Sequence, residues 1–246
     1  MIRIGTSGWV YDHWKGVFYP EGLAQEEQLP FFAQTFDTVE INYSFYRLPD
    51  EETVKSWAGK VPKGFLFSPK ASRYITHMKK LLDPEVPVAG FLDRMALLGA
   101  KLGPVLFQLP PAWHVNADRL AHFVHILPKR HRYVFEFRHA SWYTDAVYDI
   151  LEEGGCGFCI HDNQDAASPE KLTAEFTYVR FHGKRGGNDG KYTRRDLEAC
   201  ASKIARWAED GIDVYCYFNN DWKGYAVENA RELQELAGKE AQVRRI

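Results

Sequence analysis

Short apolar runs alternate with longer amphipathic segments along the whole chain. The apolar runs are rich in β-branched and aromatic residues, as in buried strands, and the segments between them repeat apolar residues every three or four positions, as in helices. We predict strands at residues 2–6, 38–42, 65–70, 105–108, 132–138, 157–161, 176–182 and 214–219. We predict helices at residues 24–35, 51–59, 88–102, 117–127, 145–153, 168–172, 193–210 and 225–237.

About eight strands alternating with about eight helices predict an α/β fold, a single (β/α)8 TIM-like barrel that spans residues 1–246 as one domain. An open doubly wound sheet also alternates strands and helices and is the competing fold. We favour the barrel because eight units is the number at which such a sheet closes. In addition, many strands end in a polar residue, whereas an open sheet places its ligand at one switch point.

The strand at residues 132–138 shows how polar and apolar residues divide between the two faces of a strand. Glu136 and Arg138 share one face, and Tyr133, Phe135 and Phe137 share the other, because side chains alternate along a strand. The aromatic face is expected to lie under the helices, which turns the acid and the base inward. The same alternation in the other strands directs further polar residues to the inner face near the strand ends: Glu40, Asn42, Lys70, Gln108, His161, Arg180, His182 and Asn219.

These residues predict a polar cluster at the C-terminal ends of the strands, where barrel enzymes hold their active sites. Burying so many polar groups is costly unless they pair with one another or with a ligand. An internal network of ion pairs is therefore the alternative interpretation for any one of them. Three cations, Lys70, Arg138 and Arg180, face two carboxylates, Glu40 and Glu136, and this positive excess favours an anionic, phosphate-like ligand.

The loops that follow the strands contain further candidates. Trp9 and Tyr43 lie in the first two loops, where their rings could stack on a ligand or cap the barrel core. The loop at residues 183–192 is rich in glycine and basic residues and ends at Tyr192. We interpret it as a lid or an anion-binding loop, with an ordinary solvated loop as the alternative. It lacks the Gly-Lys-Ser/Thr ending of a P-loop.

The composition narrows the class of protein only moderately. The 246 residues carry a formal net charge of -2, which gives no overall basic surface for nucleic acid. No apolar run is long enough to cross a membrane and no targeting segment is evident, so we expect a cytoplasmic protein with reduced thiols. Cys156 and Cys159 point to opposite faces of one strand and are interpreted as packing residues rather than metal ligands.

Five motifs carry a resemblance to a known family. They stand in order along nearly the whole chain: GTSGW at 5–9, VEINYSFY at 39–46, FEFRHASW at 135–142, YVRFHG at 178–183 and YFNND at 217–221. Together they resemble the YecE-like family, a bacterial and archaeal domain of unknown function. The resemblance implies a TIM barrel and a cytosolic protein, and it supplies no reaction. The matching positions are Glu40, Asn42, Glu136, Arg138, Arg180, His182 and Asn219, which the strand alternation also selects.

We expect an enzyme that acts on a small anionic, phosphorylated substrate by acid–base chemistry. Arg138, Arg180 and Lys70 would hold the anion, with Asn42, Gln108, Asn219, Trp9, Tyr43 and Tyr192 as further contacts. Glu136 or Glu40 would act as general acid or base, and His161 or His182 would be the proton-transfer partner. No cofactor motif is present in the sequence, so no cofactor is expected.

Two other functions stay open. A metal-assisted phosphodiesterase, suggested for the family by a distant likeness to endonuclease IV-type barrels, could use Glu40, Glu136, His161, Asp162 and His182, although two arginines on the same faces would repel a dication. A binder of nucleotides or of single-stranded nucleic acid could use the aromatic loop and the basic loop. The sequence does not predict the oligomeric state.

Overall fold

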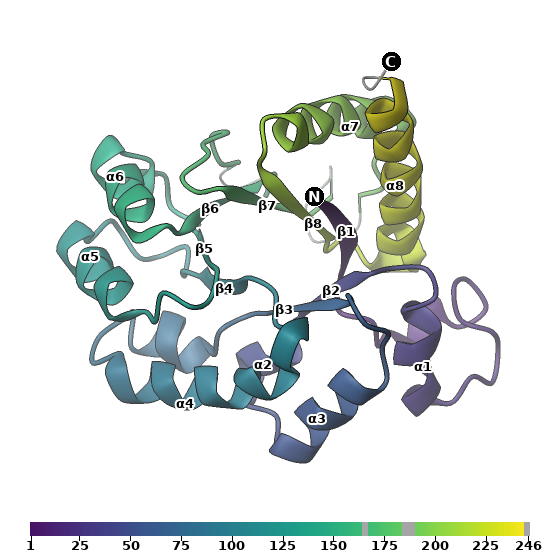
Figure 1. Cartoon of the computed structure of the whole chain (residues 1–246), viewed down its shortest axis with the longest axis horizontal. Coiled ribbons are helices and arrows are strands. Elements are labelled where there is room, and N and C mark those ends of the chain that lie inside the picture. The colour runs from purple at the N-terminus through teal and green to yellow at the C-terminus, as the bar shows by residue number, and fades with distance from the viewer. Residues whose placement is uncertain (164–166, 184–189, 244–246) are drawn as a thin grey trace.

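The computed structural model describes residues 1–163, 167–183 and 190–243, and its eight parallel strands form a barrel wall with helices outside it (Figure 1). The strands are β1 (Ile2–Ser7), β2 (Thr38–Ile41), β3 (Leu66–Pro69), β4 (Val105–Gln108), β5 (Tyr133–Glu136), β6 (Gly157–His161), β7 (Phe176–Phe181) and β8 (Asp213–Phe218). Hydrogen-bonded neighbours follow the order β3-β2-β1-β8-β7-β6-β5-β4. The predicted TIM-like barrel is therefore confirmed.

The helices that cover the wall mostly follow their strands, as predicted. They are α1 (Gln25–Phe32), α3 (Glu51–Gly59), α4 (Glu85–Met95), α5 (Ala117–Ile126), α6 (Asp145–Gly154), α7 (Arg194–Glu209) and α8 (Tyr225–Val243), with a short α2 (Tyr43–Tyr46) directly after β2. Helix α4 begins earlier than expected and continues as a 3-10 helix to Lys101, broken at Gly99, where φ is +59°. In residues 1–163, 167–183 and 190–243, no helix combines the length and the apolar character needed to span a bilayer.

The predicted helix at residues 168–172 is wrong, because the segment from 167 to 173 is not helical. Ser168 pairs with the end of β6 instead. Its backbone N–H donates to the His161 carbonyl at 2.9 Å, and its Oγ accepts from the His161 N–H at 2.8 Å. Thr173 donates its hydroxyl to the Cys156 carbonyl at 2.7 Å at the other end of the strand. These bonds hold the segment extended along β6 and use groups that a helix would need.

The barrel closes between β3 and β4 through isolated bridges, and we call this junction the β3–β4 seam. Lys70 pairs with Leu106, and the Ala71 N–H donates to the Leu106 carbonyl at 2.8 Å. The Gly103 N–H donates to the Phe67 carbonyl at 2.8 Å. By contrast, β7 and β8 pair at six successive positions. Among the described residues, the seam is therefore joined by isolated bridges and not by a continuous ladder.

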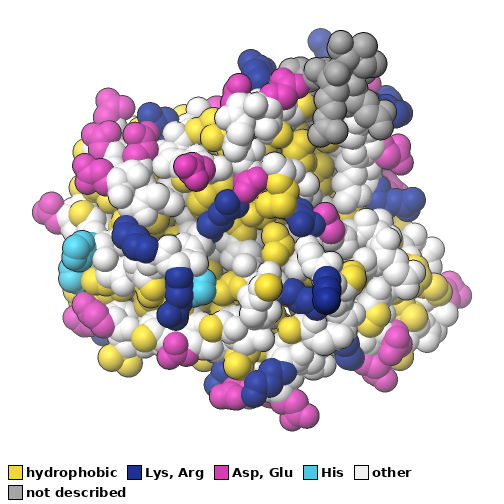
Figure 2. Space-filling model, viewed as in Figure 1, with side chains coloured by type: hydrophobic (Ala, Val, Ile, Leu, Met, Phe, Trp, Pro, Cys, Tyr) yellow, Lys and Arg dark blue, Asp and Glu magenta, His cyan; other side chains and the backbone are white. Residues whose placement is uncertain are grey.

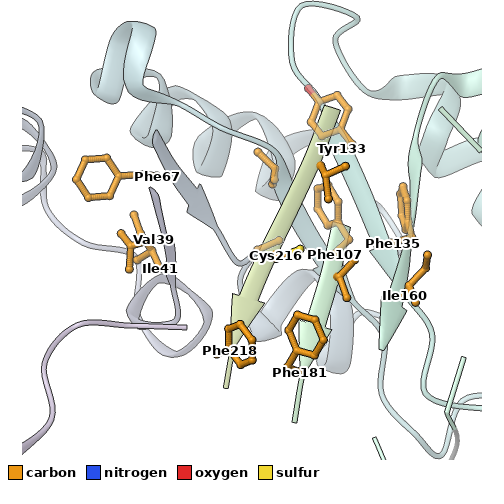
Figure 3. Packing of buried hydrophobic residues seen from close by; sticks show 14 of the residues in the cluster. Val39, Ile41, Phe67, Phe107, Tyr133, Phe135, Ile160, Phe181, Cys216 and Phe218 are labelled. Carbon is orange, nitrogen blue, oxygen red and sulfur yellow. The ribbon is translucent and has the colours of Figure 1, made fainter. Parts of the chain in front are cut away.

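The two faces of the wall separate apolar from polar chemistry, as the alternation predicts. Outward residues such as Val39, Phe67, Phe107, Phe135 and Phe181 are buried between the strands and the helices (Figure 3). A second apolar cluster fills the barrel interior: Leu106, Val134, Cys159, Phe176, Tyr178, Tyr215 and Tyr217. Cys156 belongs to the outer cluster and Cys159 to the inner one, which confirms that they point to opposite faces.

Gly5 of β1 has a neighbour too close for any side chain. A Cβ at this position would stand 2.2 Å from the carbonyl oxygen of Thr38 on β2, and a backbone atom cannot rotate away. Gly5→Ala is therefore expected to push β1 from β2 and to lower the free energy of unfolding by about 1–3 kcal/mol. Urea unfolding followed by circular dichroism measures the change.

Gly90→Ala is the matched control for Gly5→Ala. Gly90 lies in α4 with open space around its position, so an alanine there should be neutral or stabilising by up to about 1 kcal/mol. Equal effects of the two substitutions would contradict the account of Gly5.

Candidate functional site

The centre of the polar cluster is Arg180, which rises from β7 into the barrel and is 2% exposed. Its Nε and Nη2 donate to the two oxygens of Glu40 on β2 at 2.9 and 2.8 Å. Its Nη1 donates to Oε2 of Glu136 on β5 at 2.7 Å. Tyr178 donates its hydroxyl to Glu40 at 2.7 Å. Both carboxylates are fully buried. The single guanidinium of Arg180 therefore balances the charges of carboxylates on two strands, β2 and β5, across the barrel interior.

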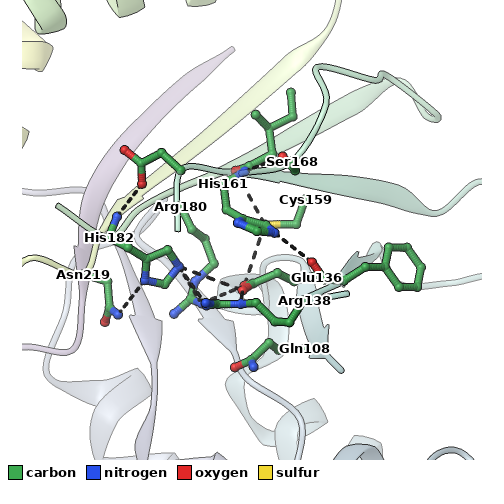
Figure 4. Close-up of polar contacts among 12 residues, drawn as sticks. Gln108, Glu136, Arg138, Cys159, His161, Ser168, Arg180, His182 and Asn219 are labelled. Atoms are coloured by element: carbon green, nitrogen blue, oxygen red, sulfur yellow. Dashed lines mark hydrogen bonds and ion pairs between the residues drawn. The ribbon is translucent and has the colours of Figure 1, made fainter. Parts of the chain in front are cut away.

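Arg138 and His182 form the next layer, toward the mouth of the barrel (Figure 4). Arg138 Nε donates to Glu136, and its Nη2 lies 2.9 Å from Nε2 of His182. Nδ1 of His182 lies 3.1 Å from the side-chain amide of Asn219. The side chain of Arg138 is 12% exposed, whereas Glu136 is fully buried. The structure thus brings Arg138, His182 and Asn219 together above the Arg180 layer.

The ionisation of this network follows from burial and charge. Burial raises the pKa of Glu136, but Arg138 and Arg180 together prevail and hold that pKa well below its usual range. Burial would lower the pKa of Arg180, and Glu136 and Glu40 hold it well above its usual range. Burial and the Arg180 charge keep the pKa of His182 well below its ordinary value. His182 is therefore neutral, which allows its Nε2 to accept the proton of Arg138.

His161 sits deeper, at the end of β6, and is also neutral, since burial lowers its pKa. Its Nε2 donates to the Phe137 carbonyl at 2.8 Å. That bond places the ring proton on Nε2 and leaves Nδ1 as an acceptor. Nδ1 is buried and has no hydrogen-bond partner among the described residues. His161 therefore offers an unused lone pair next to the network.

Lys70 is the remaining cation of the cluster, at the C-terminal end of β3. Its Nζ stands 4.2 Å from the centre of the Phe45 ring, and its side chain is largely buried. Among the described residues, none accepts a hydrogen bond from Nζ or forms an ion pair with it. Burial, followed by repulsion from Arg180, lowers the pKa of Lys70 to about 7. The two glutamates are already balanced by the two arginines, so a protonated Lys70 is a charge in excess.

The other sequence candidates fall into two groups. Gln108 and Asn42 are partly exposed at the same end of the barrel. Trp9 and Tyr43 line a cleft of about 910 Å³ that is bordered by α1 and α3 and reaches Asn42, but not Lys70, Arg138 or His182. Tyr192 does not reach the site, because it is buried against Phe181 on the outer side of β7, and its hydroxyl donates to Asp162. Loop residues 184–189, including Lys184 and Arg185, lie outside the described residues.

Two contributors are not among the predicted site residues. Phe45 belongs to the aromatic run after β2, which forms α2 instead of a loop and brings the Phe45 ring under Lys70. Trp57 of α3 packs edge-on against Trp9 at 5.4 Å and helps to line the cleft. Neither position follows from strand alternation, because both residues lie on helices. The aromatic run at 43–46 was the available signal for Phe45.

The donor set does not fit a metal ion. In the part of the chain that the structure describes, no group of three or more His, Cys, Asp and Glu side chains is placed to hold one. The oxygens of Glu40 and Glu136 are engaged by guanidinium groups, whose charge would repel a dication.

On the face shown in Figure 2, acidic and basic side chains are interspersed, in line with the small net charge.

Arg180→Met tests the central pairing. The substitution leaves two buried carboxylates without their shared partner, and removing one side of a buried ion pair typically costs about 3–5 kcal/mol. We expect at least that loss in urea unfolding. Neutralising the acids as well, in Arg180→Met with Glu40→Gln and Glu136→Gln, should recover part of it. Arg194→Met removes a surface pair with Glu198 and should change little; an equally mild Arg180→Met would contradict the assignment.

Lys70→Met tests the unpaired cation through pH. Between about pH 7 and pH 10 the folded protein holds Lys70 neutral while the unfolded chain keeps it protonated, so unfolding takes up a proton. Wild-type stability should therefore rise with pH relative to Lys70→Met, by up to about 1.4 kcal/mol per pH unit. The variant should be the more stable form below pH 7. Chemical unfolding at several pH values, without phosphate or sulfate, measures the difference.

Lys55→Met is the control for that experiment. Lys55 is 58% exposed on α3 and pairs with Glu51 at the surface. The free energy of unfolding of Lys55→Met, plotted against pH, should therefore run parallel to that of the wild type. If the free energy of unfolding of Lys70→Met also ran parallel to that of the wild type over this pH range, the pKa of Lys70 would not be lowered in the folded protein.

Comparison with known proteins places the chain in a family. The model of the family described as "Protein of unknown function DUF72" matches residues 3–245. The UPF0759 protein YunF of Bacillus subtilis (strain 168) is 26% identical, with 96% of this chain and 94% of that protein covered. The UPF0759 protein YecE of Escherichia coli (strain K12) is 31% identical over 84% of this chain and 82% of its own length. A crystal structure of a DUF72 family protein from Thermotoga maritima superposes with a TM-score of 0.88 at 26% identity, covering 97% of this chain and 99% of that one. The chain belongs to the DUF72 family.

Proposed function

We propose that the mouth of the barrel binds a small anionic, phosphate-like substrate and that the protein is an enzyme that changes it by acid–base chemistry. The observation that carries the proposal is the charge of the cluster. Glu40 and Glu136 balance Arg138 and Arg180, and Lys70 adds a buried positive charge that none of the described residues neutralises. A bound anion would supply the missing counter-charge.

The roles divide according to exposure. Arg180 and both glutamates are fully engaged with one another, so we assign them to fixing the other groups. Arg138 and Lys70 stand at the open side and would contact the anion, with Asn42, Gln108 and Asn219 as polar neighbours. His161 is a neutral base whose Nδ1 lone pair is unused, whereas the Nε2 lone pair of neutral His182 accepts from Arg138 and would be released if Arg138 turned that N–H to the anion. Proton transfer is therefore assigned to the histidines rather than to the glutamates named from sequence.

Sulfate is a useful probe because its charge is constant over the working range of pH. Calorimetric titration should detect sulfate binding to the wild type, and the affinity should fall by up to about tenfold per pH unit above pH 7, as Lys70 loses its proton. Lys70→Met should weaken binding at pH 6 by about tenfold or more and remove this pH dependence. Lys55→Met should bind as the wild type does. No binding to the wild type, or unchanged binding to Lys70→Met, would overturn the anion site.

The enzymatic half of the proposal needs a chemical readout. A panel of small phosphorylated compounds and carboxylates that compete with sulfate is incubated with the protein and followed by NMR. We expect at least one competing compound to be converted, and His182→Ala to slow that conversion while sulfate still binds. Competitors that all remain unchanged would leave a binding protein and not an enzyme.

A further inference from the structure

Lys70 is fixed at its base by contacts to β2, α2 and β4. Its backbone N–H donates to the Ile41 carbonyl of β2 at 3.0 Å, and its carbonyl accepts from the Ser44 hydroxyl at 2.7 Å. It also bridges to Leu106 of β4 across the β3–β4 seam. Its side chain leaves this anchored point toward the mouth of the barrel, with the Phe45 ring below the amine. The backbone of Lys70 is therefore fixed, and the Phe45 ring is the contact that the described residues offer its amine.

An amine in such a place is unusual among lysines. A buried ammonium normally pairs with a carboxylate, but the nearby glutamates are taken by two guanidiniums. The face of the Phe45 ring attracts the amine but carries no formal charge, so it does not replace the carboxylate partner of a buried ammonium. Desolvation and neighbouring cations are the conditions that turn a lysine into a nucleophile at neutral pH. The lowered pKa of Lys70, about 7, agrees with this reading.

We propose that Lys70 is a catalytic residue that forms an imine with an aldehyde or ketone bearing an anionic group. This inference rests on the anion binding proposed above, because Arg138 at the open side would receive the anionic group. It narrows the substrate class from small anions to small anionic carbonyl compounds. It also changes the role of Lys70 from a point charge to a reacting group.

The step balances without a cofactor. The Nζ lone pair attacks the carbonyl carbon, a C–N bond forms, and the carbonyl π electrons move to oxygen, which takes the proton that nitrogen loses to give a carbinolamine. The hydroxyl then takes up one further proton, the C–O bond breaks with loss of water, and the nitrogen lone pair forms the C=N bond. Amine, carbonyl compound and one proton thus give a protonated imine and water. The positive charge that returns to nitrogen then faces the anionic group of the substrate.

Reductive trapping tests the proposal on the intact protein. Glycolaldehyde phosphate and uncharged glycolaldehyde are each added with cyanoborohydride, and the modified lysines are located by peptide mass mapping. At pH 7 we expect the phosphorylated probe to label Lys70 at least tenfold faster than the exposed Lys55, and faster than glycolaldehyde labels Lys70. The rate at which uncharged glycolaldehyde labels Lys70 should rise with pH around 7, whereas exposed lysines respond nearer their ordinary pKa of about 10.4. Added sulfate should slow the labelling.

Lys70→Arg is the matched variant, because it keeps a cation but cannot form the imine. It should lose the rapid label while retaining sulfate binding; if it does not fold, the comparison of Lys70 with Lys55 in the wild type still decides. Sulfate binding with Lys70 labelled no faster than Lys55 would overturn the imine and leave the anion site standing. Rapid labelling by both probes without sulfate binding would uphold the reactive amine and overturn the anionic substrate.

Discussion

The ion pairs of Arg180 are the constraint on which the rest of the site depends. A carboxylate on β2 and another on β5 are fully buried, and each is tolerable only because one guanidinium from β7 reaches both. This arrangement fixes the position of the Glu136 carboxylate along the barrel axis. Glu136 in turn holds Arg138 beside His182. The layer of Arg138 and His182 at the mouth is thus built on a charged layer whose groups are engaged with one another.

The separation of these two layers explains why so many polar strand ends can coexist in one barrel. The groups of the lower layer pair with one another in charge and in hydrogen bonding. Burying its carboxylates therefore costs little free energy. The upper layer is left incomplete: Lys70 lacks a counter-charge and His161 Nδ1 lacks a donor among the described residues. Native proteins satisfy nearly all buried polar groups, and these two incomplete groups are the ones on which the proposed anion site rests.

Much of this could be predicted from the sequence, because side chains alternate strictly along a strand. That rule placed Glu40, Glu136 and Arg180 inward, and the structure confirms their burial in one cluster. The rule could not predict that both glutamates share one guanidinium, since such pairing depends on the tilt of the strands and on side-chain rotamers. The false helix at residues 168–172 shows another limit, because tertiary hydrogen bonds to β6 override local propensity there.

The β3–β4 seam has a mechanical consequence when it is considered together with Arg180. The seam strands are flanked by β2 and β5, and these are the two strands that Arg180 ties together across the interior. Opening the barrel between β3 and β4 by moving their neighbours apart would therefore have to pull two carboxylates from one cation. Arg180 thus limits from inside the barrel how far the bridged junction that carries Lys70 can widen.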